Sequence, residues 1–175
     1  DVSVRLKPGE LLLVAGSSGC GKTTLARCIN GLIPRSYKGE RSGSVTIHGR
    51  EISDLSLVEI SQVIGTLLQD PERQIVATNV VAEIAFGPEN LGLPREEILA
   101  RVDQAITRLN IEHLRSRDTF TLSGGEKQKV ALAGLLAMRP SIVLLEEPLA
   151  SLDPAPAYEA LGLFRSLADE GATII

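Results

Sequence analysis

The stretch "LLLVAGSSGCGKTT", from Leu11 to Thr24, decides the fold. Its first part, Leu11 to Ala15, is a continuous apolar run, which is typical of a strand buried on both faces of a sheet. Glycines follow, and a helix is predicted from Lys22 to Asn30, closed by Gly31. A strand, a glycine-rich loop and a helix in this order form a phosphate cradle, because backbone N–H groups point inward and the helix N-terminus adds positive potential.

Each position of this loop has an expected role in holding a nucleotide. Lys22 reaches the terminal phosphates, and the Thr23 hydroxyl is a ligand for Mg²⁺. A glycine-rich turn with a merely solvated lysine is the alternative, but it leaves the strand and helix on either side unexplained. The predicted nucleotide-binding residues are Gly16, Ser17, Ser18, Gly19, Cys20, Gly21, Lys22, Thr23 and Thr24.

Further strands and helices alternate along the rest of the chain. The apolar runs at 63–68, 142–145 and 173–175 predict buried strands, and the alternation at 44–48 predicts an exposed strand. Helical periodicity covers 95–109, 126–138 and 156–168. Buried strands separated by helices indicate a parallel sheet covered on both sides, with a helical insertion at about 79–135.

Two adjacent glutamates, Glu146 and Glu147, end the buried strand in "VLLEEP". Consecutive side chains of a strand point to opposite faces, so we expect the two carboxylates to have different tasks. Two solvated carboxylates at a strand exit are the alternative. Gln69 also follows a buried strand, where it could bond loop backbone or, beside a phosphate loop, complete Mg²⁺ coordination or sense the terminal phosphate.

The stretch "TLSGGEKQ", residues 121–128, predicts a helix start with two possible explanations. Ser123 with Glu126 three residues later can be a plain capping box, which needs no ligand. Gly124 and Gly125 are costly in a helix unless something approaches the backbone closely, and an anionic ligand is the natural candidate. Local physics alone leaves both explanations open.

Composition bounds the class of protein. A chain of 175 residues fits one domain, and its net charge of −4, with scattered Lys and Arg, argues against nucleic acid as the main partner. Cys20 and Cys28 lack metal or disulfide spacing, so we expect small buried residues in a reducing compartment. The longest apolar run, 130–138, is far short of the ~20 residues that span a bilayer. Strand-like sequence at both ends predicts a fragment of a longer protein.

Together the motifs resemble those of the ATP-binding-cassette (ABC) ATPases. "GSSGCGKTT", Gln69, "LSGGE", "VLLEEP" and "SLD" have the order and spacing of that family across essentially the whole chain. "NGLIP", "QDPERQIVATNVVAEIAFGPENLGLP" and "LSGGEKQKVALAGLLAMRP" are similar to the ATPase subunits of energy-coupling factor (ECF) importers of vitamins and of cobalt or nickel. The loop "PRSYKGERSGSV" resembles the first cassette of the duplicated forms of those subunits.

The resemblance implies an α/β fold of the P-loop NTPase class, a RecA-like parallel-sheet core with an inserted helical ABC subdomain. The chain would be a single truncated ABC ATPase domain, 1–175. Residues 1–75 and 136–175 would form the core, and residues 76–135 the helical subdomain with the signature motif.

Roles also carry over by position. Glu147 and Gln69 would be catalytic, with Glu147 as general base or water-orienting residue. Mg²⁺ would be held by Thr23, Gln69 and Glu146, although the family ordinarily has Asp at position 146. The extra methylene of Glu146 extends its carboxylate by about 1.5 Å. The signature residues, facing the ATP of a partner domain, would be Ser123, Gly124, Gly125 and Glu126, and Asp153 would lie at the dimer interface.

The implied function is an ATP-binding and hydrolysing subunit that powers a membrane importer through ATP-driven dimerisation. Its partners would be a second ABC ATPase domain and an integral-membrane transporter subunit, without nucleic acid, at the cytoplasmic face of the membrane. A chromosome-maintenance clamp would carry long coiled-coil arms, but only about 50 residues without sustained heptads separate Gln69 from Ser123. A ribosome-binding ABC factor would show basic linkers, and none is seen. His48 and His113 lie outside the motifs and are predicted surface residues.

Overall fold

The structure of the protein is a computed structural model that describes residues 2–150 and 154–175. The chain divides into two compact units. The first comprises Asp1–Thr66, Pro140–Glu146 and Leu163–Ile175, and the second comprises Leu67–Arg139 and Glu147–Gly162. These limits differ from the predicted subdomain limits at residues 75 and 136, which stay a prediction.

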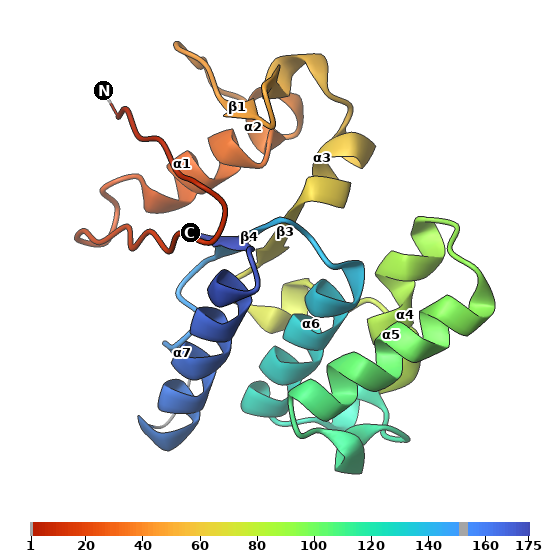
Figure 1. The fold of residues 1–175 in the computed structure, drawn as a ribbon. Coiled ribbons are helices and arrows are strands. Elements are labelled where there is room, and N and C mark those ends of the chain that lie inside the picture. The colour runs from red at the N-terminus through yellow and green to blue at the C-terminus, as the bar shows by residue number, and fades with distance from the viewer. Residues whose placement is uncertain (1, 151–153) are drawn as a thin grey trace. The chain divides into compact units, whose positions relative to one another are not determined.

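A three-stranded sheet has the order β3-β4-β5, and Figure 1 labels β3 and β4, which lie side by side. β3 spans Ile64–Leu67, β4 spans Ile142–Leu145 and β5 spans Thr173–Ile174. β4 and β5 are parallel, with Ile142 opposite Thr173. β3 and β4 are neighbours in this sheet although residues 68–141 lie between them in the sequence. The predicted strand at 142–145 is confirmed, and those at 63–68 and 173–175 are confirmed with shorter limits.

The segment 11–15 is not the buried strand that its apolar sequence predicted. Leu11 forms a single parallel bridge with Ile174, and the Leu12 N–H donates to the Ile174 carbonyl at 2.8 Å. Leu13 is 80% exposed, so within the described residues no other element covers this edge of the sheet. An apolar sequence indicates that burial of its side chains would be favourable. Whether they are buried depends on which other elements pack against them.

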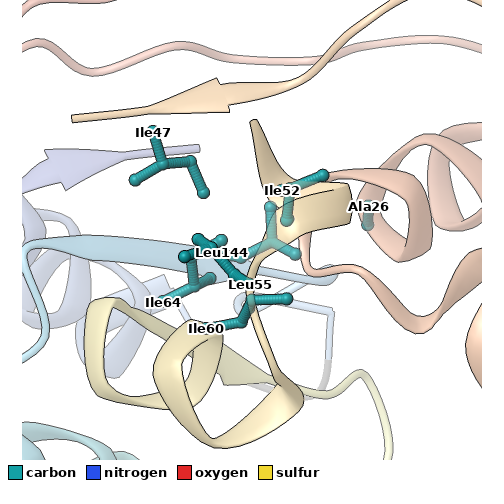
Figure 2. Close-up of a cluster of buried hydrophobic side chains, with 7 residues drawn as sticks. All are labelled: Ala26, Ile47, Ile52, Leu55, Ile60, Ile64 and Leu144. Atoms are coloured by element: carbon teal, nitrogen blue, oxygen red, sulfur yellow. The ribbon is translucent and has the colours of Figure 1, made fainter. Parts of the chain in front are cut away.

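The remaining elements of the first unit surround a small core. They are α1 (Lys22–Ile29), α2 (Leu32–Arg35), the hairpin of β1 (Thr46–Ile47) and β2 (Arg50–Glu51), the 3₁₀ turn η1 (Ile52–Asp54) and α3 (Leu57–Val63). Figure 2 shows the seven buried side chains of this core, which come from α1, the hairpin, η1, its following residue, α3, β3 and β4: Ala26, Ile47, Ile52, Leu55, Ile60, Ile64 and Leu144. The predicted strand at 44–48 is thus reduced to two residues.

The sequence prediction did not include α3, although its start carries a clear signal. Ser56 is the N-cap residue: its hydroxyl accepts a hydrogen bond from the Glu59 N–H at 3.2 Å, and the Ser56 N–H donates to the Glu59 carboxylate at 2.8 Å. The bond from the Ser56 N–H lowers the pKa of Glu59 most, and a second bond, from the Ser56 O–H to the same carboxylate oxygen at 2.9 Å, lowers it next. A Ser followed three residues later by Glu was the available signature of a helix start.

The second unit is built on three helices packed against one another, α4 (Val80–Asn90), α5 (Arg95–Arg108) and α6 (Gly124–Met138) (Figure 1). The Met138 side chain of α6 lies close against Gly87 of α4, where a Cβ would overlap its sulfur. Short 3₁₀ turns lie at η2 (Pro71–Arg73), η3 (Glu112–Leu114) and η4 (Thr119–Thr121). The side chains buried here include Val80, Ile84, Val102, Ile106, Ile111, Leu114 and Val130.

The helix predictions for the second half of the chain hold with shifted ends. α5 confirms the helix predicted at 95–109, and α6 begins two residues earlier than predicted. α7 spans Pro154–Asp169, where residues 156–168 were predicted, and the limit between the two units falls within it. Within the described ranges, no helix combines the length and apolar composition that crossing a bilayer requires.

Candidate nucleotide site

The glycine-rich loop is the first part of the candidate site, and it lies in the first unit. Gly19 and Gly21 have φ of 78° and 102°, a left-handed conformation that glycine adopts without steric cost. Gly21 is the N-cap of α1, and no side chain caps the helix. The Lys22 ammonium donates to the carbonyls of Gly16 at 2.9 Å and Ser17 at 3.1 Å. The loop therefore combines an uncapped helix N-terminus with a lysine held beside it, the arrangement expected of an anion site.

Gly16 lies close to the side chain of Cys20 in the same loop. A Cβ at this position would lie 2.6 Å from the Cys20 sulfur, so the loop closes tightly on itself. Cys20 is exposed and Cys28 is half-buried, which makes the expectation of two buried cysteines wrong. The thiol of Cys20 faces solvent because the loop that carries it is exposed from Gly16 to Gly21.

The two glutamates lie beyond the end of their strand. β4 ends at Leu145. Glu147 has a φ of 49°, in the left-handed region that residues other than glycine rarely adopt. The premise that both carboxylates alternate along an extended strand is therefore wrong. Glu147 is exposed and Glu146 is half-buried, and a turn follows in which the Ala150 N–H donates to the Glu147 carbonyl at 3.1 Å.

Gln69 and Glu147 contact each other within the second unit. The Gln69 side-chain amide donates to the Glu147 carboxylate, with 2.9 Å between Nε2 and Oε2. One residue follows β3 and the other follows β4, and these strands are neighbours in the sheet. The structure thus brings together the two residues predicted to be catalytic, which lie 78 positions apart.

The predicted signature motif starts α6 through a capping box. The Ser123 N–H donates to the Glu126 carboxylate at 2.7 Å, and the Glu126 N–H donates back to the Ser123 hydroxyl at 3.4 Å. The bond from the Ser123 N–H lowers the pKa of Glu126 most, and a bond from the Ser123 O–H to the same carboxylate oxygen, at 2.8 Å, lowers it next. The capping explanation of this pair is therefore correct for Glu126.

Capping does not explain the two glycines between them. Gly124 and Gly125 have ordinary φ, and a Cβ at either would meet nothing within 4 Å. Neither the backbone conformation nor packing against the described residues therefore requires glycine here. Glycine nevertheless makes the helix less stable by about 0.5–1 kcal/mol than Ala would. The open space above these residues is what a close-approaching ligand needs.

The sequence prediction missed three residues whose side chains bond to the segments around Gln69 and Glu147. Gln128 of α6 donates to the Pro148 carbonyl at 2.5 Å, and Lys127 pairs with Glu72 in η2. Glu83, 8% exposed, accepts the N–H groups of Val76 at 2.9 Å and Ala77 at 2.7 Å. The signal for Glu83 and Gln128 is a polar residue on the apolar face of a helix, which an analysis of helical periodicity reveals.

The remaining predicted residues are placed as follows. His48 and His113 are exposed, as predicted, and His48 contacts the Ser141 hydroxyl at 3.0 Å. Asp153 lies outside the described residues. Thr23, exposed in the first turn of α1, belongs to the first unit with Glu146, whereas Gln69 belongs to the second. Among residues 2–150 and 154–175 there is no group of three His, Cys, Asp or Glu suited to a metal ion.

Comparisons with known proteins agree with these motifs. The family model described as "ABC transporter" matches residues 1–150. A Methanosarcina mazei protein assigned as an ABC transporter ATP-binding protein is 45% identical over 176 residues, which are 100% of this chain and 30% of that protein. A Bacillus subtilis protein, YkoD, assigned as an HMP/thiamine import ATP-binding protein, is 44% identical over 97% of this chain and 31% of its own length. The chain thus spans about a third of these curated relatives.

A solved structure matches the whole fold. CbiO1 from Clostridium perfringens, described as part of the ABC transporter complex CbiONQ, superposes with a TM-score of 0.87 at 36% identity. The match covers 99% of this chain and 68% of that one. The predicted α/β fold of the P-loop NTPase class, with its inserted helices, is confirmed by this likeness and by the family match. The chain therefore belongs to the ABC transporter family.

Proposed function

We propose that this chain is an ATP-binding and hydrolysing cassette that powers a membrane importer. The observation that carries the hydrolytic part is the 2.9 Å hydrogen bond between Gln69 and Glu147, which unites an amide and a carboxylate from the ends of two neighbouring strands. An importer is supported by YkoD, named for HMP/thiamine import, and by CbiO1, named as part of a transporter complex. The substrate class is accordingly a vitamin or a cobalt or nickel ion, chosen by a membrane subunit of the ECF type.

ATP binds at the glycine-rich loop in this proposal. The loop from Gly16 to Gly21, which is exposed, presents backbone N–H groups to the phosphates together with the first turn of α1, and the half-buried Lys22 lies beside it. Thr23, Gln69 and Glu146 would hold Mg²⁺, whose preference for oxygen ligands suits a hydroxyl, an amide oxygen and a carboxylate. When bound, Mg²⁺ would supply positive charge that offsets the charge of the phosphate oxygens. The hydrogen bond to Glu147 engages the Gln69 nitrogen, so the amide oxygen is turned away from that contact.

Hydrolysis is an in-line attack of water on the γ-phosphate, in which positioning and charge neutralisation do most of the catalysis. Glu147 orients the water and accepts its proton, and Gln69 holds the Glu147 carboxylate through its side-chain amide. Because Glu147 is exposed, water reaches its carboxylate without a conformational change in this unit.

A second cassette completes the site. Ser123, Gly124, Gly125 and Glu126 face the ATP of the partner domain, and the open space above the two glycines supports this role. Asp153 couples the two domains at their interface. Residues 76–135 receive the integral-membrane subunit, while residues 1–75 and 136–175 form the nucleotide-binding core, at the cytoplasmic face of the membrane.

The test is Glu147→Gln in the full-length protein. We expect kcat for ATP hydrolysis to fall by about 100-fold or more, as for removal of a general base, while ATP still binds. The control is Glu112→Gln, an exposed glutamate in η3 of the same unit, which should leave kcat within about twofold. Undiminished hydrolysis in Glu147→Gln would refute the assignment of Glu147. Co-purification with ribosomes or chromosomal DNA, and with no membrane protein, would refute the transport role.

A further inference from the structure

The turn that carries Glu147 is strained and must be held by its surroundings. Glu147 has a φ of 49°, a conformation that persists in residues other than glycine only where neighbouring contacts fix it. The hydrogen bonds at this turn include Ala150 N–H to the Glu147 carbonyl, Gln69 to the Glu147 carboxylate, and Gln128 to the Pro148 carbonyl. Of these, the bond from Gln128 comes from a buried side chain outside the turn.

Gln128 is an unusual residue for its place. It lies on α6, is 7% exposed, and its neighbours Val130, Ala131 and Leu132 on the same helix are buried apolar residues. Its Nε2 donates to the Pro148 carbonyl at 2.5 Å, whereas its Oε1 is buried without a hydrogen-bond partner in the described part of the chain. Burying an unpaired polar atom is unfavourable, so an apolar residue would pack here at lower cost. The donor to Pro148 is therefore the feature that requires glutamine.

The neighbouring residue of α6 contacts the other catalytic segment. Lys127, with 17% of its side chain exposed, pairs with Glu72 in η2, two residues after the N-cap Asp70 and three after Gln69. Consecutive residues of α6 thus hold the segment after Gln69 and the segment after Glu147. The same helix begins at Ser123 and Gly124, the predicted contacts of the partner's ATP.

We infer that Gln128 is a positioning residue that fixes the strained Glu147 turn to the start of the signature helix. It touches no reacting atom, and it acts by holding the Pro148 carbonyl so that the Glu147 carboxylate stays against Gln69. This inference rests on the proposed hydrolytic function for its kinetic consequence. Its structural consequence, a turn that opens more often when the donor is removed, does not depend on that function.

The variant Gln128→Met keeps the length of the side chain and removes the donor. In the full-length protein we expect kcat for ATP hydrolysis to fall about 10- to 100-fold, since a displacement near 1 Å at a reacting centre has an effect of that order. KM for ATP should stay within about twofold, because the loop from Gly16 to Thr24 belongs to the other unit. Lys129→Ala, a half-buried position next to Gln128, is the matched control and should leave kcat within about twofold.

Two further measurements separate positioning from a general loss of structure. Amide hydrogen exchange at Ala150, whose N–H closes the turn, should be faster in Gln128→Met, and exchange in the α5 helix should be unchanged. In the Glu147→Gln background, adding Gln128→Met should lower kcat by no more than about twofold, because residues acting as one unit are not additive. If Gln128→Met does not fold, Gln128→Asn, which withdraws the amide by about 1.5 Å, replaces it with the same expectations.

The results that overturn the inference differ from those that overturn the proposed function. An unchanged kcat, unchanged exchange at Ala150, or a large additional loss in the Glu147→Gln background would each refute Gln128 as a positioning residue. If the full-length protein without substitutions neither binds nor hydrolyses ATP, the proposed function is refuted. In that case faster exchange at Ala150 in Gln128→Met would still support the structural half of the inference.

Discussion

Glu83 offers the sharpest test of how the second unit is held together. Its carboxylate, 8% exposed, accepts the N–H groups of Val76 and Ala77 through one oxygen, at 2.9 and 2.7 Å. These bonds tie the segment after Gln69 to the first turns of α4. Replacing Glu83 by Ala leaves both N–H groups without their charged acceptor.

The magnitude follows from the geometry. Hydrogen bonds to a charged group contribute about 1.5–3 kcal/mol each, so the two together contribute about 3–6 kcal/mol. Val76 is 63% exposed and Ala77 is half-buried, so solvent lies close to both residues and we take the lower end of this range. We expect Glu83→Ala to lower the free energy of unfolding by about 3 kcal/mol. Glu83→Gln should lower it by about 1 kcal/mol, since the amide oxygen still accepts but carries no charge.

The assay combines urea denaturation with amide exchange. A loss of about 3 kcal/mol corresponds to roughly 100-fold faster exchange at Val76 and Ala77 if local opening governs it. Glu89→Ala, an exposed glutamate on the same helix, is the control and should stay within about 0.5 kcal/mol of the natural protein. If Glu83→Ala changes stability by less than 1 kcal/mol and leaves exchange at Val76 and Ala77 unaltered, the reasoning is refuted.

Three other predictions concern stability and the signature glycines. Ile60→Ala, at a position 3% exposed in the core of the first unit, should cost about 2–5 kcal/mol in thermal or urea unfolding, whereas Val58→Ala on the same helix, 64% exposed, should cost under about 0.5. The pKa of Glu126 is lowered in the folded state, so its contribution is present above the unfolded value of about 4.3 and is lost as pH falls through the folded value. The stability difference between the natural protein and Glu126→Gln, followed from pH 7 to pH 3, should therefore shrink towards acid, and a constant difference would contradict it. Gly124→Ala and Gly125→Ala should each raise helix stability by about 0.5–1 kcal/mol and yet impair ATP hydrolysis, because the space above them is open in this chain; unimpaired hydrolysis in both would argue against a ligand there.

Local sequence signals predicted the elements that depend on local chemistry. α1 follows the glycine loop as expected, and β4 spans the predicted residues because four apolar residues stand between Pro140–Ser141 and the two glutamates. The capping box at Ser123 was predictable from spacing alone, and so was the one at Ser56, which the prediction omitted.

Features that depend on distant partners were not predictable in this way. The segment 11–15 is apolar enough for a core strand, but its exposure depends on which elements cover the sheet edge. The left-handed φ of Glu147 could not be predicted from its residue type, because glutamate is rarely found in that conformation. The contact of Gln69 with Glu147 depends on β3 and β4 being neighbours, which neither segment specifies by itself.

The pairing of β3 with β4 across residues 68–141 has a consequence for folding. These two strands pair only after the long segment between them has closed into a loop. Because the sheet depends on contacts between residues far apart in the sequence, we expect it to form slowly. The helices α4, α5 and α6 depend on contacts between residues closer in the sequence. Closure entropy depends only logarithmically on length, so halving or doubling the segment would alter the free energy of closure by about 0.6 kcal/mol. The sheet therefore places little constraint on the size of this insertion, and selection is free to lengthen or shorten it without losing the pairing of β3 with β4.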